Sequence, residues 1–110
     1  MENTLNTALL NGSVLIVDDD FEALEEMADA LQSYGLDVHT ATDEETALEQ
    51  ALKYSPEFVM MDYLLRGSTG LNAVGEIHKH LPDTKIIMIS GFEDLFSVVT
   101  SMNSVNDGVI

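Results

Sequence analysis

The chain has 110 residues, 45% of them hydrophobic, which suits one globular domain with a modest core. Its 20 acidic and 4 basic residues give a formal net charge of -16, and this field repels nucleic acid phosphates and anionic lipids, so we expect no direct binding to nucleic acid or membranes. The absence of cysteine excludes disulfides, thiolate metal sites and cysteine nucleophiles.

The polar residues 1–12 are interpreted as an N-terminal tail, and residues 13–110 as the folded domain. The tail lacks the basic segment and the long apolar stretch of a signal peptide. No apolar run is long enough to span a bilayer. We therefore expect a cytoplasmic protein.

Strand and helix patterns alternate from the first apolar run onward. This run predicts a strand over residues 14–17, and the weak alternation of residues 36–41 predicts a second strand. Between them, apolar residues recur at helical spacing from Phe21 to Tyr34, and Gly35 follows as a stop signal. The pattern predicts an amphipathic helix between the two strands.

The second predicted helix begins with a capping box of Thr42 and Glu45 and ends before Pro56. A third apolar run predicts a strand over residues 58–61. Strand and helix therefore continue to alternate.

The turn-rich residues 66–70 lead into a third helix that Pro82 closes, and a fourth strand follows over residues 86–89. The face that this helix is predicted to bury consists of Leu71, Val74, Ile77 and Leu81. A last helix is predicted to bury Leu95, Val98, Val99 and Met102. Residues 108–110 look like the start of a fifth strand.

Strands that are apolar on both faces and alternate with helices indicate a parallel sheet with helices on either side, joined by right-handed crossovers. The predicted class is therefore α/β with a doubly wound parallel sheet. Ligands of such sheets bind outside the carboxyl ends of the strands.

Oxygen-bearing side chains follow three of the predicted strands at this edge. Asp18, Asp19 and Asp20 follow the first strand, Asp62 the third and Ser90 the fourth. Neighbouring strands lie about 4.8 Å apart, so these side chains can converge on one small site. Close carboxylates repel one another by roughly 4 kcal/mol per pair at an effective dielectric of about 20, and a divalent cation relieves this repulsion. Hard oxygen donors favour Mg²⁺, whereas the simpler alternative is that the three aspartates cap the first helix.

Asp62 is the candidate nucleophile of this site. A carboxylate at a strand end beside a bound cation can attack a phosphoryl group in line and carry it as an acyl phosphate. Ser90 could donate its hydroxyl to a phosphoryl oxygen. The simpler alternatives are that Asp62 caps a loop and that the backbone satisfies the Ser90 hydroxyl.

Three motifs occur in order along the chain. They are Val-Leu-Ile-Val-Asp-Asp-Asp at 14–20, Met-Met-Asp at 60–62 with Gly70 eight residues later, and Ile-Met-Ile-Ser-Gly at 87–91. Together they resemble the response-regulator receiver domain of two-component signalling, over residues 13–110. The resemblance implies a flavodoxin-like fold with strand order 2-1-3-4-5, whose fifth strand and last helix are incomplete here. It also implies a signalling phosphoacceptor rather than an enzyme, with a histidine kinase or a phosphotransfer protein as its partner.

The resemblance assigns a role to each residue that matches the family's metal site. Asp62 would receive the phosphoryl group and, with Asp19, bind Mg²⁺ directly. Asp18 would contribute largely through water, and the main-chain carbonyl of Leu64 would complete the protein ligands.

Two further residues would contact the phosphoryl group, according to the same resemblance. The Ser90 hydroxyl would turn toward it and signal its presence, and the Gly91 amide would bond a phosphate oxygen. Receivers normally also carry a lysine just after the fifth strand, and its position would fall just past Ile110. An alternative is therefore a receiver-like interaction module whose phosphorylation is impaired.

A hydrolase of the haloacid dehalogenase type is a second alternative, because that family also uses an aspartate after its first strand. It requires Asp-x-Asp-x-Thr, whereas residues 18–22 are Asp-Asp-Asp-Phe-Glu, without threonine. The pattern therefore favours the receiver.

An incomplete last helix would leave apolar surface of the sheet without cover. Burial of one helix stripe is worth several kcal/mol at about 25 cal/mol/Å², which is comparable to the stability of a small domain. We therefore expect either a fragment of a longer protein or association with itself or a partner through the uncovered sheet face.

Overall fold

The computed structural model of this chain describes residues 12–62, 65 and 70–89. The elements within them are β1 (Ser13–Val17), α1 (Phe21–Gln32), β2 (Asp37–Ala41), α2 (Glu44–Tyr54), β3 (Phe58–Asp62), α3 (Leu71–His80) and β4 (Lys85–Ile89). Within this part of the chain, no helix is long and apolar enough to cross a membrane. The predicted fifth strand and last helix lie outside the described residues, as do residues 1–11 of the predicted tail.

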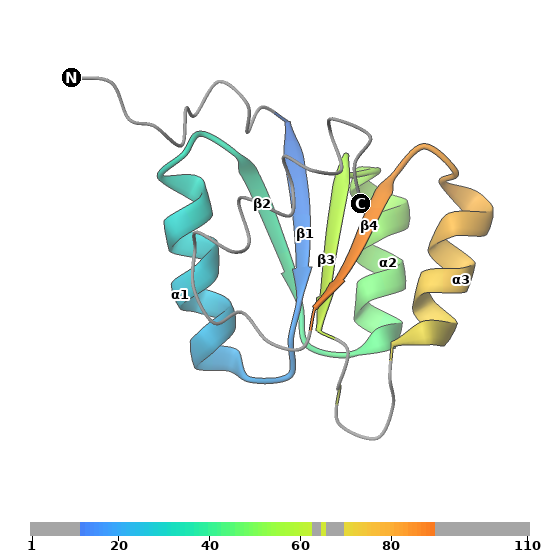
Figure 1. The fold of residues 1–110 in the computed structure, drawn as a ribbon, viewed down its shortest axis with the longest axis horizontal. Coiled ribbons are helices and arrows are strands. Elements are labelled where there is room, and N and C mark those ends of the chain that lie inside the picture. The colour runs from blue at the N-terminus through green and yellow to red at the C-terminus, as the bar shows by residue number, and fades with distance from the viewer. Residues whose placement is uncertain (1–11, 63–64, 66–69, 90–110) are drawn as a thin grey trace.

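The four strands form one parallel sheet in the order β2-β1-β3-β4, and Figure 1 shows their arrowheads pointing the same way. Val17 of β1 pairs with Met61 of β3, and Asp62 of β3 pairs with Ile89 of β4. The predicted doubly wound sheet is confirmed for these four strands. Their carboxyl ends lie together at the lower edge in Figure 1.

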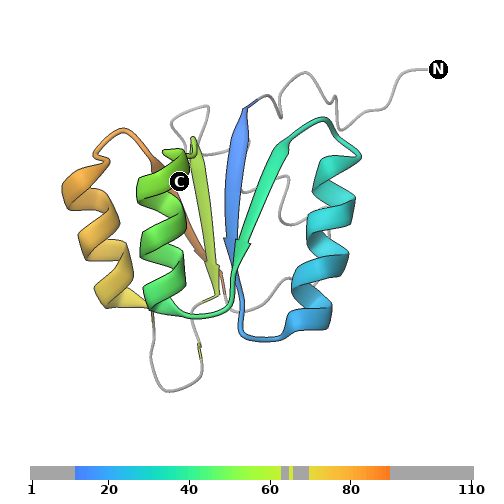
Figure 2. The ribbon, with the colours of Figure 1, turned by 180° about the vertical axis from the view of Figure 1, so that it is seen from behind.

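The central strands β1 and β3 are buried on both faces, and helices cover each face. α1 lies apart from α2 and α3, and these two helices lie side by side (Figures 1 and 2). The core on the α1 side includes Val14, Ile16, Phe58 and Met60. The core on the α2 and α3 side includes Leu15, Val17, Val59 and Met61. Alternate residues of one strand therefore serve two cores, which explains the continuous apolar runs.

α1 follows the predicted amphipathic pattern and buries Leu24, Met27 and Leu31. The Asp20 side chain is its N-cap and accepts hydrogen bonds from the backbone N–H groups of Glu22 and Ala23. These donors have no carbonyl partner inside the helix, so the carboxylate satisfies them and also lies at the positive end of the helix dipole.

The capping box predicted for Thr42 and Glu45 is wrong by one residue. Asp43 is the N-cap of α2, and its carboxylate accepts a hydrogen bond from the backbone N–H of Thr46 at 2.8 Å. Hydrogen bonds from the Thr46 backbone and side chain hold the pKa of Asp43 below its usual value. A carboxylate gains more from the helix dipole than a neutral hydroxyl, which favours Asp43 over Thr42.

The face predicted to be buried on α3 is also partly wrong. Leu71 is 52% exposed, whereas Ala73 and Ile77 are buried. Ala73 and Ile77 are four residues apart and share a face, but a two-residue step turns the helix by about 200°. Leu71 therefore points away from the sheet when Ala73 faces it.

We expect Ser55→Gly to stabilise the protein by about 1 kcal/mol. α2 ends before Pro56, as predicted, and its C-cap Ser55 adopts a left-handed conformation with φ 46° and ψ 59°. An L-residue pays a steric cost there that glycine avoids. Urea unfolding measures the change in free energy.

Ser33→Gly is the matched control for this prediction. Ser33 is the C-cap of α1 but has right-handed helical angles, with φ -66° and ψ -16°. Glycine brings no steric relief at such a position, adds backbone entropy to the unfolded chain and removes the hydrogen bond from the Ser33 hydroxyl to the Ala30 carbonyl, so this variant should be destabilised. Equal effects of the two substitutions would contradict the argument.

Candidate functional site

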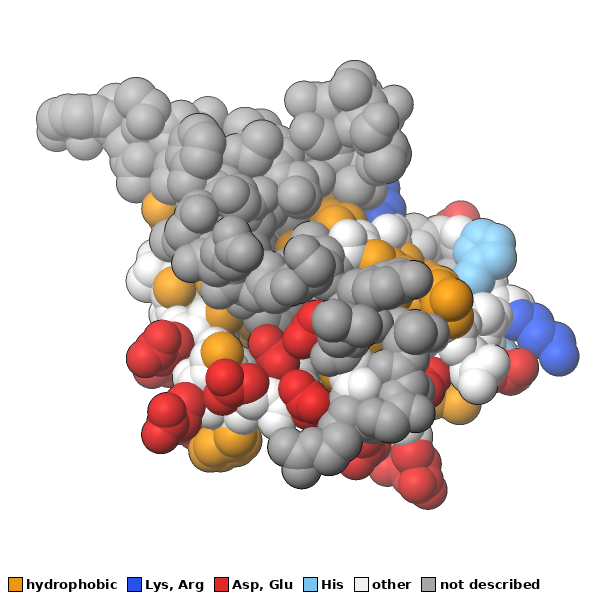
Figure 3. Space-filling view, turned by 60° about the horizontal axis from the view of Figure 1, so that its bottom comes forward, with side chains coloured by type: hydrophobic (Ala, Val, Ile, Leu, Met, Phe, Trp, Pro, Cys, Tyr) orange, Lys and Arg blue, Asp and Glu red, His pale blue; other side chains and the backbone are white. Residues whose placement is uncertain are grey.

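Three aspartates converge at the carboxyl edge of the sheet because β1 and β3 end side by side. Asp18 follows Val17, and Asp62 follows the Met61 that pairs with Val17. One carboxylate oxygen from each of Asp18, Asp19 and Asp62 lies within 4.8 Å of the other two. Figure 3 brings this edge forward and shows many acidic side chains across it.

Asp20 takes a different role from the two aspartates before it. Its side chain caps α1, while its backbone N–H donates to Oδ1 of Asp18 at 3.0 Å. The helix-capping alternative therefore holds for one of the three adjacent aspartates. Asp18 and Asp19 instead join Asp62, and we call these three residues the acidic cluster.

The other predicted site residues are Leu64, Ser90 and Gly91, and all three lie outside the described residues. β4 is described as far as Ile89, which pairs with Asp62. The acidic cluster is thus the part of the predicted site that the structure brings together.

Asp18 and Asp62 are the buried members of the acidic cluster. Asp18 is only 4% exposed and Asp62 only 8%. Burial raises the pKa of Asp18 to about 6, and the nearby charges of Asp62 and Asp19 act in the same direction, while the hydrogen bond from the Asp20 backbone opposes the shift. The ligand oxygens of the acidic cluster lie within 4.8 Å of one another. Two carboxylate charges at that distance repel by about 3.5 kcal/mol at an effective dielectric of about 20. A cation that neutralises them is therefore strongly favoured.

The donor set of the acidic cluster fits a hard divalent cation. All three ligand atoms are carboxylate oxygens, and they are close enough to share one ion directly or through water. Mg²⁺ is commonly held by one or two carboxylates together with waters and phosphate oxygens. The acidic cluster is therefore suited to a hard divalent cation such as Mg²⁺.

We expect Mg²⁺ affinity to fall by up to about tenfold between about pH 7 and about pH 5, because cation binding requires ionised carboxylates. The raised pKa of Asp18, about 6, places its protonation inside this window. The stability of the ion-free protein changes in the opposite direction. In the folded state the Asp18 carboxyl holds its proton more tightly than in the unfolded chain. Protonation of Asp18 therefore stabilises the ion-free folded protein fully below about pH 4, and this stabilisation is lost as the pH rises through about 6.

Calorimetric titration with Mg²⁺ at both pH values tests this dependence. Asp18→Asn is the control, because it removes the titrating carboxylate but keeps the shape of the side chain. Its affinity should be lower and should change little between the two pH values. The same pH dependence in Asp18→Asn and wild type would show that another group is responsible.

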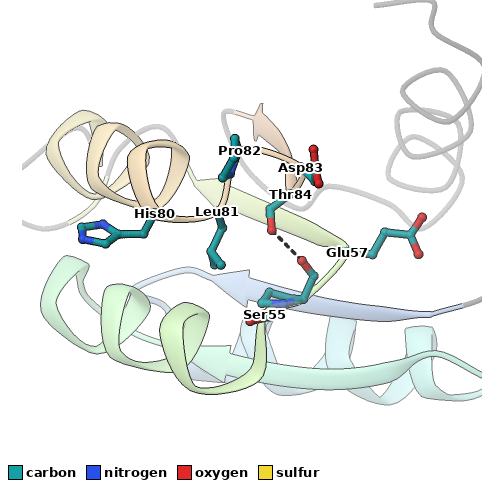
Figure 4. Close-up of a pocket in the computed structure, with 8 residues that line it drawn as sticks. Ser55, Glu57, His80, Leu81, Pro82, Asp83 and Thr84 are labelled. Carbon is teal, nitrogen blue, oxygen red and sulfur yellow. Dashed lines mark hydrogen bonds between the residues drawn. The ribbon is translucent and has the colours of Figure 1, made fainter.

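A hollow of about 330 Å³ lies at the opposite, amino-terminal edge of the sheet. Figure 4 shows around it the end of α3, with His80, and residues of the loops before β3 and β4, including Glu57 and Asp83. The Thr84 hydroxyl donates to the Pro56 carbonyl at 2.8 Å and joins the two loops. None of the acidic cluster residues lines this hollow, so we assign it no part in the candidate site.

Comparison with known protein families matches residues 14–110 to the response regulator receiver domain. This chain belongs to the receiver domain family. The predicted resemblance is confirmed, and the chain is a signalling module rather than an enzyme. The hydrolase alternative is therefore not supported.

Several bacterial regulators contain a similar receiver domain. The acid tolerance regulatory protein ActR of Rhizobium meliloti (strain 1021) is 29% identical over 98 residues, which cover 89% of this chain and 49% of ActR. The nitrogen assimilation regulatory protein NtrX of Azorhizobium caulinodans is 30% identical over 81% of this chain and 20% of NtrX. The receiver chain thus spans about half the length of ActR and less of NtrX.

Solved receiver structures share the fold. The response regulator TrrA of Thermotoga maritima, crystallised with Mg²⁺ and BeF, is 32% identical, with a TM-score of 0.65 over 81% of each chain. The complex of TrrA with the histidine kinase ThkA gives 30% identity and a TM-score of 0.66 over 81% of this chain and 80% of the matched chain. A CheY-like receiver domain from Methanospirillum hungatei JF-1 gives 28% identity and a TM-score of 0.68, covering 88% of this chain and 75% of that one.

Glu44 was not among the predicted site residues, although its side chain links α2 to α3. Its Oε1 atom accepts a hydrogen bond from the backbone N–H of Ala73. The local signal for this contact is that Gly70, the residue before α3, has no side chain that could cap the helix.

Proposed function

We propose that this receiver domain accepts a phosphoryl group on Asp62 in a site that also binds Mg²⁺. The observation that supports this most directly is the acidic cluster, in which oxygens of Asp18, Asp19 and Asp62 lie within 4.8 Å of one another at the carboxyl edge of a receiver fold. TrrA, which is 32% identical, was crystallised with Mg²⁺ and BeF.

The proposed reaction transfers a phosphoryl group from a phosphohistidine to an Asp62 carboxylate oxygen. The new O–P bond forms as the P–N bond breaks, and the departing imidazole nitrogen keeps its electron pair and takes up a proton. Mg²⁺, when bound, neutralises charge on the phosphoryl oxygens and the carboxylates. Because Asp62 is only 8% exposed, its surroundings limit access of water to the acyl phosphate.

The remaining assignments within the site belong to the same proposal. Asp19 and Asp62 bind Mg²⁺ directly, Asp18 acts largely through water, and the Leu64 carbonyl completes the protein ligands. The Ser90 hydroxyl switches toward the phosphoryl group, and the Gly91 amide bonds it. Ser90 is next in sequence to Ile89, which pairs with Asp62, and this register supports the assignment.

A histidine kinase or a phosphotransfer protein is the proposed phosphoryl donor. TrrA, which shares the receiver fold, was crystallised with the kinase ThkA. Self-association through an uncovered sheet face stays a prediction, because the last helix lies outside the described residues. The cytoplasmic location also stays a prediction.

Incubation with acetyl phosphate tests the proposal, with intact-protein mass as the measurement. With Mg²⁺ present, we expect the protein to gain one phosphoryl group as acetate leaves, and hydroxylamine should remove it because acyl phosphates react with this reagent. EDTA should prevent the gain. Mg²⁺ binding without phosphoryl uptake would favour the impaired interaction module, and failure of both would overturn the proposal.

A further inference from the structure

Within the described part of the chain, the N-terminus of α3 lacks the side-chain cap that α1 and α2 possess. Asp20 and Asp43 cap those two helices, whereas α3 starts after Gly70 and has no acidic residue in its first turn. The first backbone N–H groups of a helix have no partner within the helix, and a buried one left unsatisfied is costly. Among the described residues, an acceptor for α3 therefore has to come from another element.

Glu44, the first residue of α2, supplies this acceptor. Its Oε1 atom lies 2.7 Å from the backbone nitrogen of Ala73, across 29 residues of sequence. Ala73 is the third residue of α3, so its N–H is one of the unpaired donors. The bond is partly buried and its acceptor is a carboxylate, which makes it stronger than a bond between neutral groups.

The first turn of α3 packs directly against the end of β3. A Cβ atom added to Gly70 would lie only 3.0 Å from Cγ and 3.1 Å from Sδ of Met61, so the Gly70 backbone rests on that side chain. Leu65 and Ala73 belong to the same buried apolar cluster as Met61. Asp62, the proposed phosphoacceptor, is the next residue after Met61.

We propose that Glu44 is a positioning residue for the phosphoacceptor site, an inference that rests on the function proposed above. Glu44 fixes the first turn of α3 through Ala73, and that turn holds Met61 and the end of β3. Protein interiors are close-packed, so a shift of the first turn of α3 also moves the residues that this turn contacts. Loss of the Glu44 contact should therefore move Asp62 relative to Asp18 and Asp19.

Glu45 provides a matched control on the same turn of α2. Glu44 and Glu45 both line a hollow of about 270 Å³ between α2 and α3, together with Asn72 and Glu76. Among the described residues, α3 donates a hydrogen bond to the Glu44 side chain but none to that of Glu45. The two glutamates thus have the same charge and neighbouring positions, but only Glu44 accepts the hydrogen bond from α3.

Three variants of the 110-residue chain separate the effect of side-chain length from the effect of side-chain charge. Glu44→Asp keeps the charge but is one methylene too short to reach Ala73, whereas Glu44→Gln loses the charge but keeps an acceptor oxygen at the same reach. Glu45→Asp is the control. Calorimetric Mg²⁺ titration, hydrogen exchange of the Ala73 amide and thermal unfolding are measured for each variant.

We expect Glu44→Asp to weaken Mg²⁺ binding by about fivefold and to speed Ala73 exchange by about tenfold. Glu44→Gln and Glu45→Asp should remain within about twofold of wild type for Mg²⁺ binding. A purely structural contact would lower the thermal midpoint of Glu44→Asp but leave its Mg²⁺ affinity unchanged, and that result would overturn the inference.

Equal weakening by Glu44→Asp and Glu44→Gln would also overturn it, because the hydrogen bond would then not explain the effect. A failure of the proposed function would give a different pattern of Mg²⁺ binding. If the wild-type chain itself binds no Mg²⁺, the phosphoacceptor proposal falls and the role of Glu44 falls with it. If the wild type binds Mg²⁺ and Glu44→Asp binds it equally well, only the role of Glu44 is lost.

Discussion

Asp62→Asn is expected to abolish phosphoryl uptake from acetyl phosphate and to weaken Mg²⁺ binding by at least about tenfold. The substitution keeps the size of the side chain but replaces a nucleophilic carboxylate oxygen with an amide. It also removes one charge from a cluster whose three ligand oxygens lie within 4.8 Å of one another. Intact-protein mass follows uptake, and calorimetry follows Mg²⁺ affinity.

Asp20→Asn is the matched control for this prediction. Asp20 belongs to the same run of aspartates as Asp18 and Asp19, but its side chain caps α1. Asparagine is as good an N-cap as aspartate, so this variant should take up the phosphoryl group and bind Mg²⁺ nearly as the wild type does. Undiminished uptake by Asp62→Asn would show that another residue is the phosphoacceptor.

Phe58→Ala is expected to lower the free energy of unfolding by about 3 to 5 kcal/mol. Phe58 is fully buried in β3 and belongs to the core on the α1 side. Truncation of its ring removes apolar contacts and leaves a cavity that close-packed neighbours fill only in part. Domains of this size have a total stability of only about 5 to 15 kcal/mol, so urea unfolding should show a large shift.

Phe21→Ala makes the same chemical change on the surface. Phe21 is the first residue of α1 and is 60% exposed. Its loss should change the free energy of unfolding by less than about 0.5 kcal/mol. A similar loss of stability in the two variants would contradict the assignment of Phe58 to a core that holds β3 in place.

The predictions for Asp62 and Phe58 separate the phosphoacceptor site from the apolar core that holds its strand. Asp62→Asn should remove phosphoryl uptake and leave the apolar core intact, whereas Phe58→Ala should weaken the strand that carries Asp62. Mg²⁺ links the two effects, because an ion that binds only the folded state stabilises it. Added Mg²⁺ should therefore raise the thermal midpoint of Phe58→Ala, and this rise depends on the acidic cluster.

The order of the elements and the edge that holds the site could be predicted from the sequence alone. Apolar runs marked β1 and β3, because strands buried on both faces need apolar residues at successive positions. Parallel strands joined by crossovers place their carboxyl ends at one edge, so Asp18, Asp19 and Asp62 were predicted to meet.

Local helix detail was predicted less well, because several residues satisfy the same local rule. Thr42 and Asp43 can both cap a helix, and the carboxylate of Asp43 does so. The periodicity of α3 allowed a face that included Leu71, but packing against the sheet selected the face of Ala73 and Ile77.

Only the tertiary structure decided how the adjacent aspartates divide their roles and how α3 is capped. Asp18 is buried in the cluster while Asp20 turns to α1, although both are aspartates in one short run. The contact from Glu44 to Ala73 joins two helices across 29 residues of sequence. Periodicity and capping rules describe neighbours along the chain, whereas burial and contacts between helices depend on how all the elements pack together.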